Sequence, residues 1–151
     1  MVMNILNPST GEDKASRMIP YRILLADDHA LIREEIKRIL GECAEVKVVG
    51  EAYDGREALV LVEKLPPDMV ILDISMPNLG GLGATQRIKR LHPEVKVLIL
   101  TMHNSWEYFH NAILAGADGY LLKEDANTEL FPAIEKIRQG KVYISPHLGA
   151  K

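Results

Sequence analysis

The sequence predicts an α/β domain in which a parallel β-sheet is covered by helices on both faces, a doubly wound (βα)5 sandwich. From residue 21 onward, short apolar runs rich in β-branched residues alternate with amphipathic stretches. Two of the runs show no polar alternation, as is typical of parallel strands buried on both faces. The alternation continues for five units in a chain of 151 residues, which favours one domain with right-handed crossovers.

Five apolar runs are short enough to be strands and are bounded by polar or turn-forming residues. The third and fourth are the runs that show no polar alternation, so we expect them at the centre of the sheet. The predicted strands are residues 23–26, 46–49, 69–72, 95–100 and 120–122.

Between and after these runs lie five stretches with apolar residues at helical spacing, which predict helices packed on the sheet. We expect Asn104 or Ser105 to cap the fourth helix. The apolar positions are Ile32, Ile36, Ile39, Leu40, Ala58, Val62, Leu65, Ala84, Ile88, Leu91, Phe109, Ala112, Ile113, Leu130, Ile134 and Ile137. The predicted helix ends are marked by glycine or proline, at Gly41, Pro66, Pro93, Gly116 and Gly140.

The two chain ends differ from this pattern. Residues 1–20 contain proline, serine and asparagine without a sustained apolar period, so we expect a flexible lead-in or sequence added for expression. Residues 21–140 form the predicted domain. Residues 141–151 are expected to leave it.

Composition excludes several classes of function. The net charge of −3 and the pI near 6.0 provide no basic surface for binding nucleic acid. Cys43 is the only cysteine, so no internal disulfide forms, which fits a reducing cytoplasm. No apolar run approaches the roughly 18 residues of a membrane span. We therefore expect a cytoplasmic protein that does not contact the membrane.

Polar groups follow four of the predicted strands at the end where ligands bind in open α/β sheets. Asp27 and Asp28 follow the first run, Asp73 the third, Thr101 the fourth and Lys123 the fifth. With a strand order of 2-1-3-4-5, the first and third strands are neighbours and their aspartates meet. A single aspartate or threonine at a strand end more often caps a helix or turn, and a lone lysine is usually solvated. Their coincidence on four segments favours a site.

The chemistry of this set indicates phosphoryl transfer. Converging carboxylates repel unless a hard cation such as Mg²⁺ binds them, and Mg²⁺ held by carboxylates usually also binds phosphate. Lys123 supplies a positive charge and Thr101 a short hydroxyl donor. Asp73, at the middle of the edge, is the expected nucleophile, and its product is an acyl phosphate.

The residues at these positions resemble the receiver domain of bacterial two-component response regulators over roughly residues 21–140. The Asp-Asp-His, Thr-Met-His and Gly-Tyr-Leu-Leu-Lys sequences look most like the subfamily with a C-terminal helix-turn-helix (LuxR-type) DNA-binding domain. The matching stretches are residues 24–29 (LLADDH), 71–77 (ILDISMP), 98–103 (LILTMH) and 115–123 (AGADGYLLK).

The resemblance implies roles for the acidic residues. Asp73 is the implied phosphate-accepting residue. Asp27 and Asp28 are the implied acid pair for Mg²⁺, and of the two Asp28 is expected to be the direct ligand. Asp73 and the backbone carbonyl of Ser75 complete the implied metal ligands. The implied fold is flavodoxin-like with strand order 2-1-3-4-5.

The resemblance also implies a switch. Thr101 is the hydroxyl drawn toward the phosphoryl group, Tyr120 is the aromatic residue that follows it inward, and Lys123 pairs with the phosphoryl oxygens. Acceptance and loss of the phosphoryl group are self-catalysed, so the domain is not an enzyme in the usual sense. The loop at residues 78–83 carries more glycine than the family pattern, which leaves its stiffness open.

The implied partners are a sensor histidine kinase, or a small phosphodonor, and a second copy of the domain. DNA is reached only through an output domain that is absent from residues 1–151, so residues 141–151 are expected to begin a linker, unless the receiver stands alone. Two alternatives stay open. The first is a Mg²⁺-dependent phosphatase with an aspartyl intermediate, which would need an acidic residue at position 75, where this chain has serine. The second is an adaptor that binds partners without phosphorylation, which would not need Asp73 and Lys123.

Overall fold

The structure is a computed structural model that describes residues 19–150. Its strands form one parallel sheet in the order β2-β1-β3-β4-β5-β6. The strands are β1 (Tyr21–Ala26), β2 (Val46–Ala52), β3 (Met69–Leu72), β4 (Lys96–Thr101), β5 (Gly119–Leu122) and β6 (Tyr143–Ile144). The predicted order of the first five strands is confirmed, and β6 is a strand that the sequence did not predict. Of the predicted lead-in, residues 1–18 lie outside the described residues.

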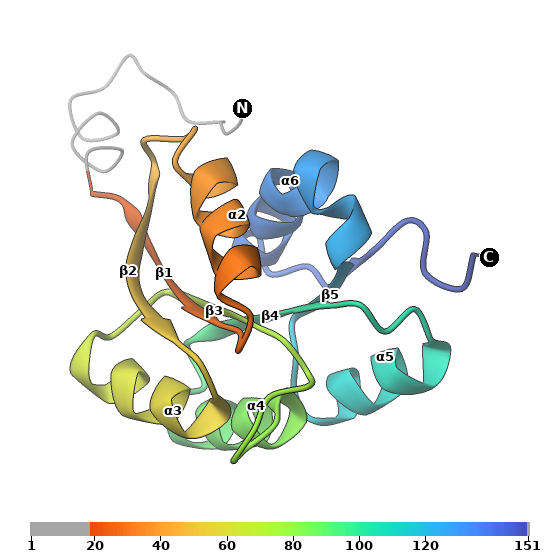
Figure 1. The fold of residues 1–151 in the computed structure, drawn as a ribbon, viewed down its shortest axis with the longest axis horizontal. Helices are drawn as coiled ribbons and strands as arrows, with labels where there is room; N and C mark the ends of the chain where they lie inside the picture. Colours follow the sequence, from red (N-terminus) through yellow and green to blue (C-terminus); the bar gives the residue numbers. More distant parts are fainter. Residues whose placement is uncertain (1–18, 151) are drawn as a thin grey trace.

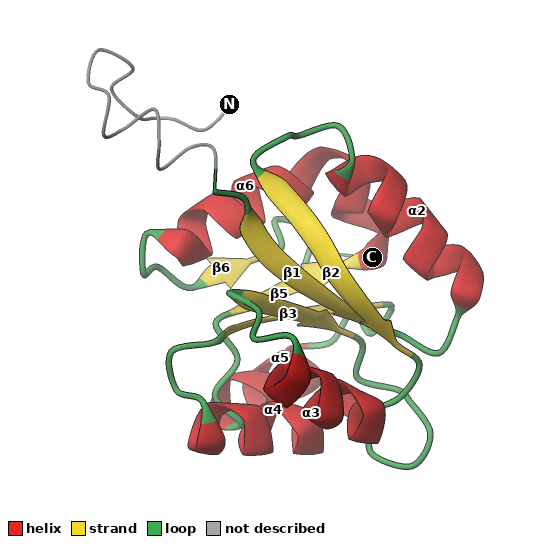
Figure 2. Cartoon of the chain, turned by 90° about the vertical axis from the view of Figure 1, so that its left-hand side faces the viewer, coloured by secondary structure: helices red, strands yellow, loops and turns green. Residues whose placement is uncertain are grey.

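Helices cover both faces of the sheet, as predicted. Figures 1 and 2 show α2 and α6 on one face and α3, α4 and α5 on the other. The helices are α2 (Ala30–Leu40), α3 (Gly55–Lys64), α4 (Gly81–Leu91), α5 (Trp106–Leu114) and α6 (Ala126–Arg138), with a 3-10 turn η1 (Lys123–Asp125) before α6. Within residues 19–150, the helices are all too short or too polar to cross a membrane.

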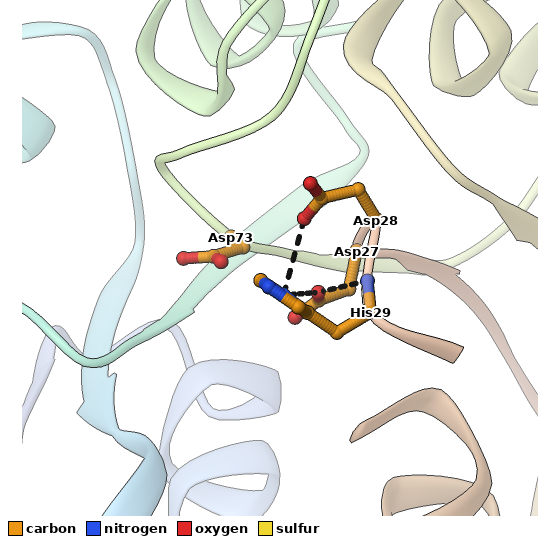
Figure 3. Close-up of side chains that lie close together, drawn as sticks. All are labelled: Asp27, Asp28, His29 and Asp73. Carbon is orange, nitrogen blue, oxygen red and sulfur yellow. Dashed lines mark hydrogen bonds and ion pairs between the residues drawn. The ribbon is translucent and has the colours of Figure 1, made fainter. Parts of the chain in front are cut away.

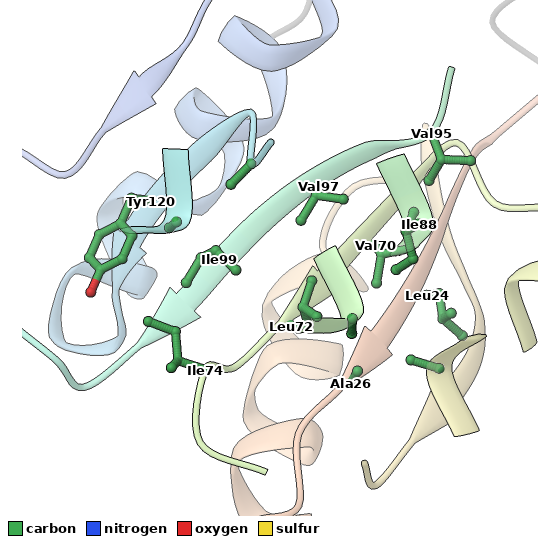
Figure 4. Packing of buried hydrophobic residues seen from close by; sticks show 14 of the residues in the cluster. Leu24, Ala26, Val70, Leu72, Ile74, Ile88, Val95, Val97, Ile99 and Tyr120 are labelled. Carbon is green, nitrogen blue, oxygen red and sulfur yellow. The ribbon is translucent and has the colours of Figure 1, made fainter. Parts of the chain in front are cut away.

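The pleat of the sheet divides the core into two layers. Leu24 and Val70 pack toward α3, α4 and α5, in the cluster shown in Figure 4. Ile23 and Ile71, one position away, pack toward α2 and α6. Because both layers are apolar, every residue of β3 is buried, and the continuous apolar run that precedes Asp73 is explained.

Local capping sets the start of α5 where the sequence predicts it. The Ser105 hydroxyl accepts hydrogen bonds from the backbone N–H groups of Glu107 and Tyr108, at 3.2 and 3.5 Å. Such a cap satisfies N–H groups that have no partner within the helix. Of the two candidate caps, Ser105 is therefore confirmed, and Asn104 is left available for another contact.

The chain does not leave the domain directly after α6. Gly140 adopts a positive φ of 85°, and the chain turns back so that Tyr143 pairs with Gly119 and Ile144 with Tyr120. Ser145 and Leu148 are then buried against the domain. That residues 141–151 begin a linker stays a prediction. The structure adds that residues 143–145 first pair along β5 and that residues 149 and 150 contact Asn104.

Candidate functional site

The strand register brings the predicted site residues together at one edge of the sheet. Ala26 of β1 pairs with Leu72 of β3, and the backbone N–H of Asp73 donates to the Ala26 carbonyl at 3.0 Å. The residues that follow these strands, Asp27 and Asp73, are therefore neighbours. Thr101 of β4 pairs in the same way with Leu122 of β5, immediately before Lys123.

Lys123 links two of the carboxylates. Its Nζ lies 2.8 Å from Asp27 Oδ2 and 3.1 Å from Asp73 Oδ2. The side chains of Lys123, Asp27 and Asp73 are only 7%, 8% and 5% exposed. Burial alone would lower the pKa of the Lys123 ammonium, but the hydrogen bond that it donates to Asp27 and the charges of both aspartates outweigh burial and raise it. The buried carboxylate at the end of β3 thus has the partner that its burial requires.

The same edge holds a set of donors that fits a divalent cation. Asp27, Asp28, His29 and Asp73 each present a ligand atom, and these atoms all lie within 4.8 Å of one another (Figure 3). In an octahedral shell of radius about 2.1 Å, opposite ligand atoms are about 4.2 Å apart, so small movements would bring the carboxylates onto one ion. Carboxylate oxygens are the donors that Mg²⁺ prefers, and the residues present therefore fit Mg²⁺.

His29 and Arg33 were not predicted at the site. His29 Nδ1 lies 3.0 Å from Asp27 Oδ1 and 3.2 Å from Asp28 Oδ1, so its ring stands between the two acids. Arg33, on the first turn of α2, donates from Nη1 to the Asp27 carbonyl at 2.5 Å and from Nε to Glu51 at 3.1 Å. The Asp-Asp-His stretch gave a signal for His29. Arg33 lacked one, because its role depends on a contact between α2 and β2.

The loop after β3 is held close to Asp73. The backbone N–H of Ile74 donates to Asp73 Oδ1 at 2.7 Å, which fixes one carboxylate oxygen. Gly81, the first residue of α4, lies so near that a Cβ there would overlap the Asp73 carbonyl. Asn78 adopts a positive φ of 66° and donates to Asp54 Oδ2 at 2.5 Å. The glycine-rich loop is therefore anchored at several points, and Gly81 is required by packing.

Thr101 and Tyr120 are both buried, and the β4–α5 loop joins them. The Thr101 hydroxyl accepts a hydrogen bond from the backbone N–H of His103 at 3.3 Å. The Tyr120 hydroxyl donates to the His103 carbonyl at 2.7 Å, and its ring makes an edge contact with Phe109. Burial, and then the charge of Asp73, raise the pKa of the Tyr120 hydroxyl. Tyr120 thus already points inward, toward the loop that follows Thr101.

His103 also joins the two loops that border the site. Its Nε2 lies 2.9 Å from the Ser75 hydroxyl, and its ring stacks on Tyr108 with centroids 4.1 Å apart. The loop after β3 and the loop after β4 are therefore bridged by side chains. The sequence predicted Ser75 at the site through its backbone carbonyl, whereas the bond between its hydroxyl and His103 depends on the paths of both loops.

A parallel sheet with three aspartates and a lysine at its switch point defines the class of α/β signalling domains called receivers. The chain belongs to the response regulator receiver domain family, whose profile matches residues 23–135. Members of this family act as signalling proteins rather than as classical enzymes.

Named relatives agree with this assignment. The chain is 42% identical to the transcriptional regulatory protein DegU of Brevibacillus brevis over 141 residues, which cover 93% of this chain and 57% of that protein. It is 42% identical to the response regulator UvrY of Escherichia coli K12 over 123 residues, or 82% of this chain and 56% of UvrY. The chain thus spans a little over half the length of these relatives.

Solved structures show the same fold. A LuxR-family two-component response regulator from Aurantimonas sp. SI85-9A1 superposes with a TM-score of 0.82 at 37% identity, covering 85% of this chain and 92% of that one. The receiver domain of the putative response regulator NarL from Mycobacterium tuberculosis gives 0.77 at 33% identity, covering 82% and 99%. The expected likeness to LuxR-type regulators is confirmed.

Proposed function

We propose that this domain accepts a phosphoryl group on Asp73 and converts it into a change of surface. The observation that carries the proposal is the double ion pair of Lys123, which holds Asp27 and Asp73 together in a buried position. Breaking such a pair leaves a buried charge without a partner, which is unfavourable. A chemical change at Asp73 therefore favours a rearrangement of the groups around it.

Four groups of this chain would hold Mg²⁺: the carboxylates of Asp27, Asp28 and Asp73 and the backbone carbonyl of Ser75. The clustering of ligand atoms within 4.8 Å supports the three carboxylates. Bound Mg²⁺ supplies positive charge that neutralises the phosphoryl oxygens. Lys123 offsets part of the charge of Asp27 and Asp73, which favours the approach of an anionic phosphodonor to Asp73.

In the transfer step, a carboxylate oxygen of Asp73 forms a bond to phosphorus as the bond from phosphorus to the donor breaks. With a phosphohistidine donor, the electron pair of the broken bond stays on the imidazole nitrogen. Lys123, released from Asp73 Oδ2, pairs with the new phosphoryl oxygens. In the reverse direction, water attacks phosphorus, the bond from phosphorus to the Asp73 oxygen breaks, and inorganic phosphate leaves as the carboxylate is restored. We propose that the domain itself catalyses this dephosphorylation.

The change of surface would run through Thr101 and Tyr120. A phosphoryl group adds nearly two negative charges and new acceptor oxygens, which attract the Thr101 hydroxyl. The Tyr120 hydroxyl donates to the His103 carbonyl in the loop after Thr101. Movement of this loop therefore changes the hydrogen bond that holds the tyrosine ring inward. The domain then favours a second arrangement of this loop.

The relatives suggest the partners. DegU is named a transcriptional regulatory protein, and the solved neighbours include LuxR-family regulators. We infer a cytoplasmic sensor-kinase pathway in which a histidine kinase supplies the phosphoryl group. The receiver forms homodimers on phosphorylation, and control of transcription is exerted by a DNA-binding domain beyond residues 1–151.

The assignment of Asp73 is tested with acetyl phosphate and Mg²⁺. The parent protein gains the mass of one phosphoryl group, and Asp73→Asn abolishes the gain because an amide cannot form the acyl phosphate. Intact-protein mass spectrometry measures both. Asp118→Asn is the matched control, since Asp118 is ion-paired to Lys89 and immediately precedes β5, at the opposite end of that strand from Lys123. Labelling of Asp73→Asn at the parental level would refute the assignment.

A further inference from the structure

The segment that follows β6 contacts the site loops although the proposed chemistry does not use it. Residues 145–150 are here called the C-terminal segment. It begins beside β5, where the backbone N–H of Ser145 donates to the Tyr120 carbonyl at 2.9 Å. Leu148 is buried in the same cluster as the Tyr120 ring. The segment therefore packs on the strand that carries the proposed switch aromatic.

Asp125 fixes the near end of the segment. The Ser145 hydroxyl donates to Asp125 Oδ2 at 2.6 Å and accepts from the backbone N–H of Leu122 at 3.2 Å. His147 Nδ1 lies 2.8 Å from the other oxygen of Asp125. These contacts attach the segment to the turn that directly follows Lys123, so it is anchored within a few residues of the acidic site.

Asn104 fixes the far end. Its side-chain amide donates to the Ala150 carbonyl at 2.9 Å and accepts from the backbone N–H of Gly149 at 2.6 Å. Trp106 lies against Gly149, which has a φ of +87°, so closely that a Cβ on this glycine would overlap the indole nitrogen. The side-chain amide of Asn104 thus bonds the backbone of both Gly149 and Ala150, and a side chain at position 149 would be strained.

These far-end contacts come from the loop that follows Thr101. Asn104 is the next residue after His103, whose N–H is bonded to the Thr101 hydroxyl and whose carbonyl accepts from Tyr120. A displacement of Thr101 toward Asp73 changes the hydrogen bond of His103, and the neighbouring Asn104 moves with it. The site and the C-terminal segment are therefore connected through one short loop.

We propose that the β4–α5 loop is an interaction surface whose partner is the chain's own C-terminal segment. The loop binds Gly149 and Ala150 of this segment when Thr101 is bonded to His103, and releases them when Thr101 turns to a phosphoryl group on Asp73. This inference rests on the proposed phosphorylation of Asp73. Coupling between two binding events is reciprocal. If phosphorylation weakens binding of the segment by a given factor, then loss of segment binding strengthens the phosphorylated arrangement by the same factor.

The first test is amide hydrogen exchange, followed by NMR, with and without beryllofluoride and Mg²⁺ as a stable mimic of the phosphoryl group. Exchange at Gly149 is expected to become at least tenfold faster with the mimic, because its acceptor on Asn104 moves away. Unchanged or slower exchange at Gly149, together with chemical-shift changes at Asp73 that prove binding of the mimic, would overturn the inference and leave the proposed function intact. Absence of any shift at Asp73 would count against the proposed function itself.

The second test uses Asn104→Ala. This side chain is exposed, so the variant is expected to fold, and it should show fast exchange at Gly149 without the mimic. It should also bind beryllofluoride more tightly than the parent, by the factor by which beryllofluoride accelerates exchange at Gly149 in the parent. Asn111→Ala, an exposed asparagine on α5, is the matched control and should behave as the parent does. If Asn104→Ala binds the mimic no more tightly than Asn111→Ala, the coupling does not exist.

Discussion

Two buried aspartates near the carboxyl end of the sheet carry different kinds of partner. Asp73 pairs with Lys123, and both side chains are almost fully enclosed. Asp125 pairs with His147, whose side chain is 63% exposed. Burying a pair with permanent charge is costly and gives no clear gain in stability, so the Asp73 pair is best explained by function. In the Asp125 pair only the histidine is exposed, so this contact depends on pH, and it holds a chain segment in place.

The largest effect is expected from removing the enclosed cation. Lys123→Met leaves Asp27 and Asp73 buried without their shared partner, and the free energy of unfolding should fall by about 3 kcal/mol. Added Mg²⁺ should restore part of the loss, because it binds the same carboxylates. Urea unfolding with and without Mg²⁺ measures both effects.

The control for this variant is Lys136→Met, an exposed lysine on α6, which should stay within about 0.5 kcal/mol of the parent. Equal stabilities of Lys123→Met and Lys136→Met would mean that the Asp73 pair is no more enclosed in solution than a surface contact. The contrast between the two aspartates would then be lost.

A smaller effect is expected from Gly81→Ala, which places a methyl group against the backbone carbonyl of Asp73. Backbone cannot move aside as a flexible side chain can, so the variant should lose about 2 kcal/mol of stability. Thermal unfolding measures the loss. Gly83→Ala, two residues further along α4, meets the end of the Leu79 side chain and should be close to neutral. A neutral Gly81→Ala would show that the loop after β3 is looser than described.

The smallest effect concerns the Asp125 pair and appears only as a dependence on pH. The hydrogen bond and charge of Asp125 raise the pKa of His147 above 6.5, so its contribution to stability is present below pH 6.5 and is lost as the pH rises through the folded value. Burial alone would raise the pKa of Asp125, but its bonds to Ser145 and His147 lower it below 3.8. The contribution of Asp125 is therefore lost only in more acidic solution.

The stability difference between the parent and His147→Gln should thus be greatest between about pH 4 and pH 6.5 and should vanish at high pH. Chemical unfolding across this range, monitored by circular dichroism, measures it. A difference that does not change with pH would mean that His147 holds the segment by its shape and not by its charge.

Much of the fold follows from the sequence because its signals are local. The unbroken apolar run before Asp73 identifies a strand buried on both faces, and Ser105 caps a helix through its own neighbours. The residues proposed for the site lie at strand ends, so a correct strand order is enough to bring Asp27 and Asp73 together.

What the sequence did not predict depends on contacts between distant segments. β6 is two residues long and has no periodic signal, and it forms because the chain turns at Gly140 and meets the free side of β5. The ion pair of Arg33 with Glu51 requires α2 to lie beside β2. The bond between Ser75 and His103 requires two loops to meet, which no single stretch of sequence specifies.

The short β6 also has a consequence for how molecules behave at high concentration. The outermost strand of an open sheet has unpaired backbone groups to which a strand of another molecule can add, which is a common start of aggregation. With two residues, β6 offers too few such groups for a stable intermolecular ladder, although Ile144 is partly exposed. This edge of the sheet is therefore protected against intermolecular strand pairing.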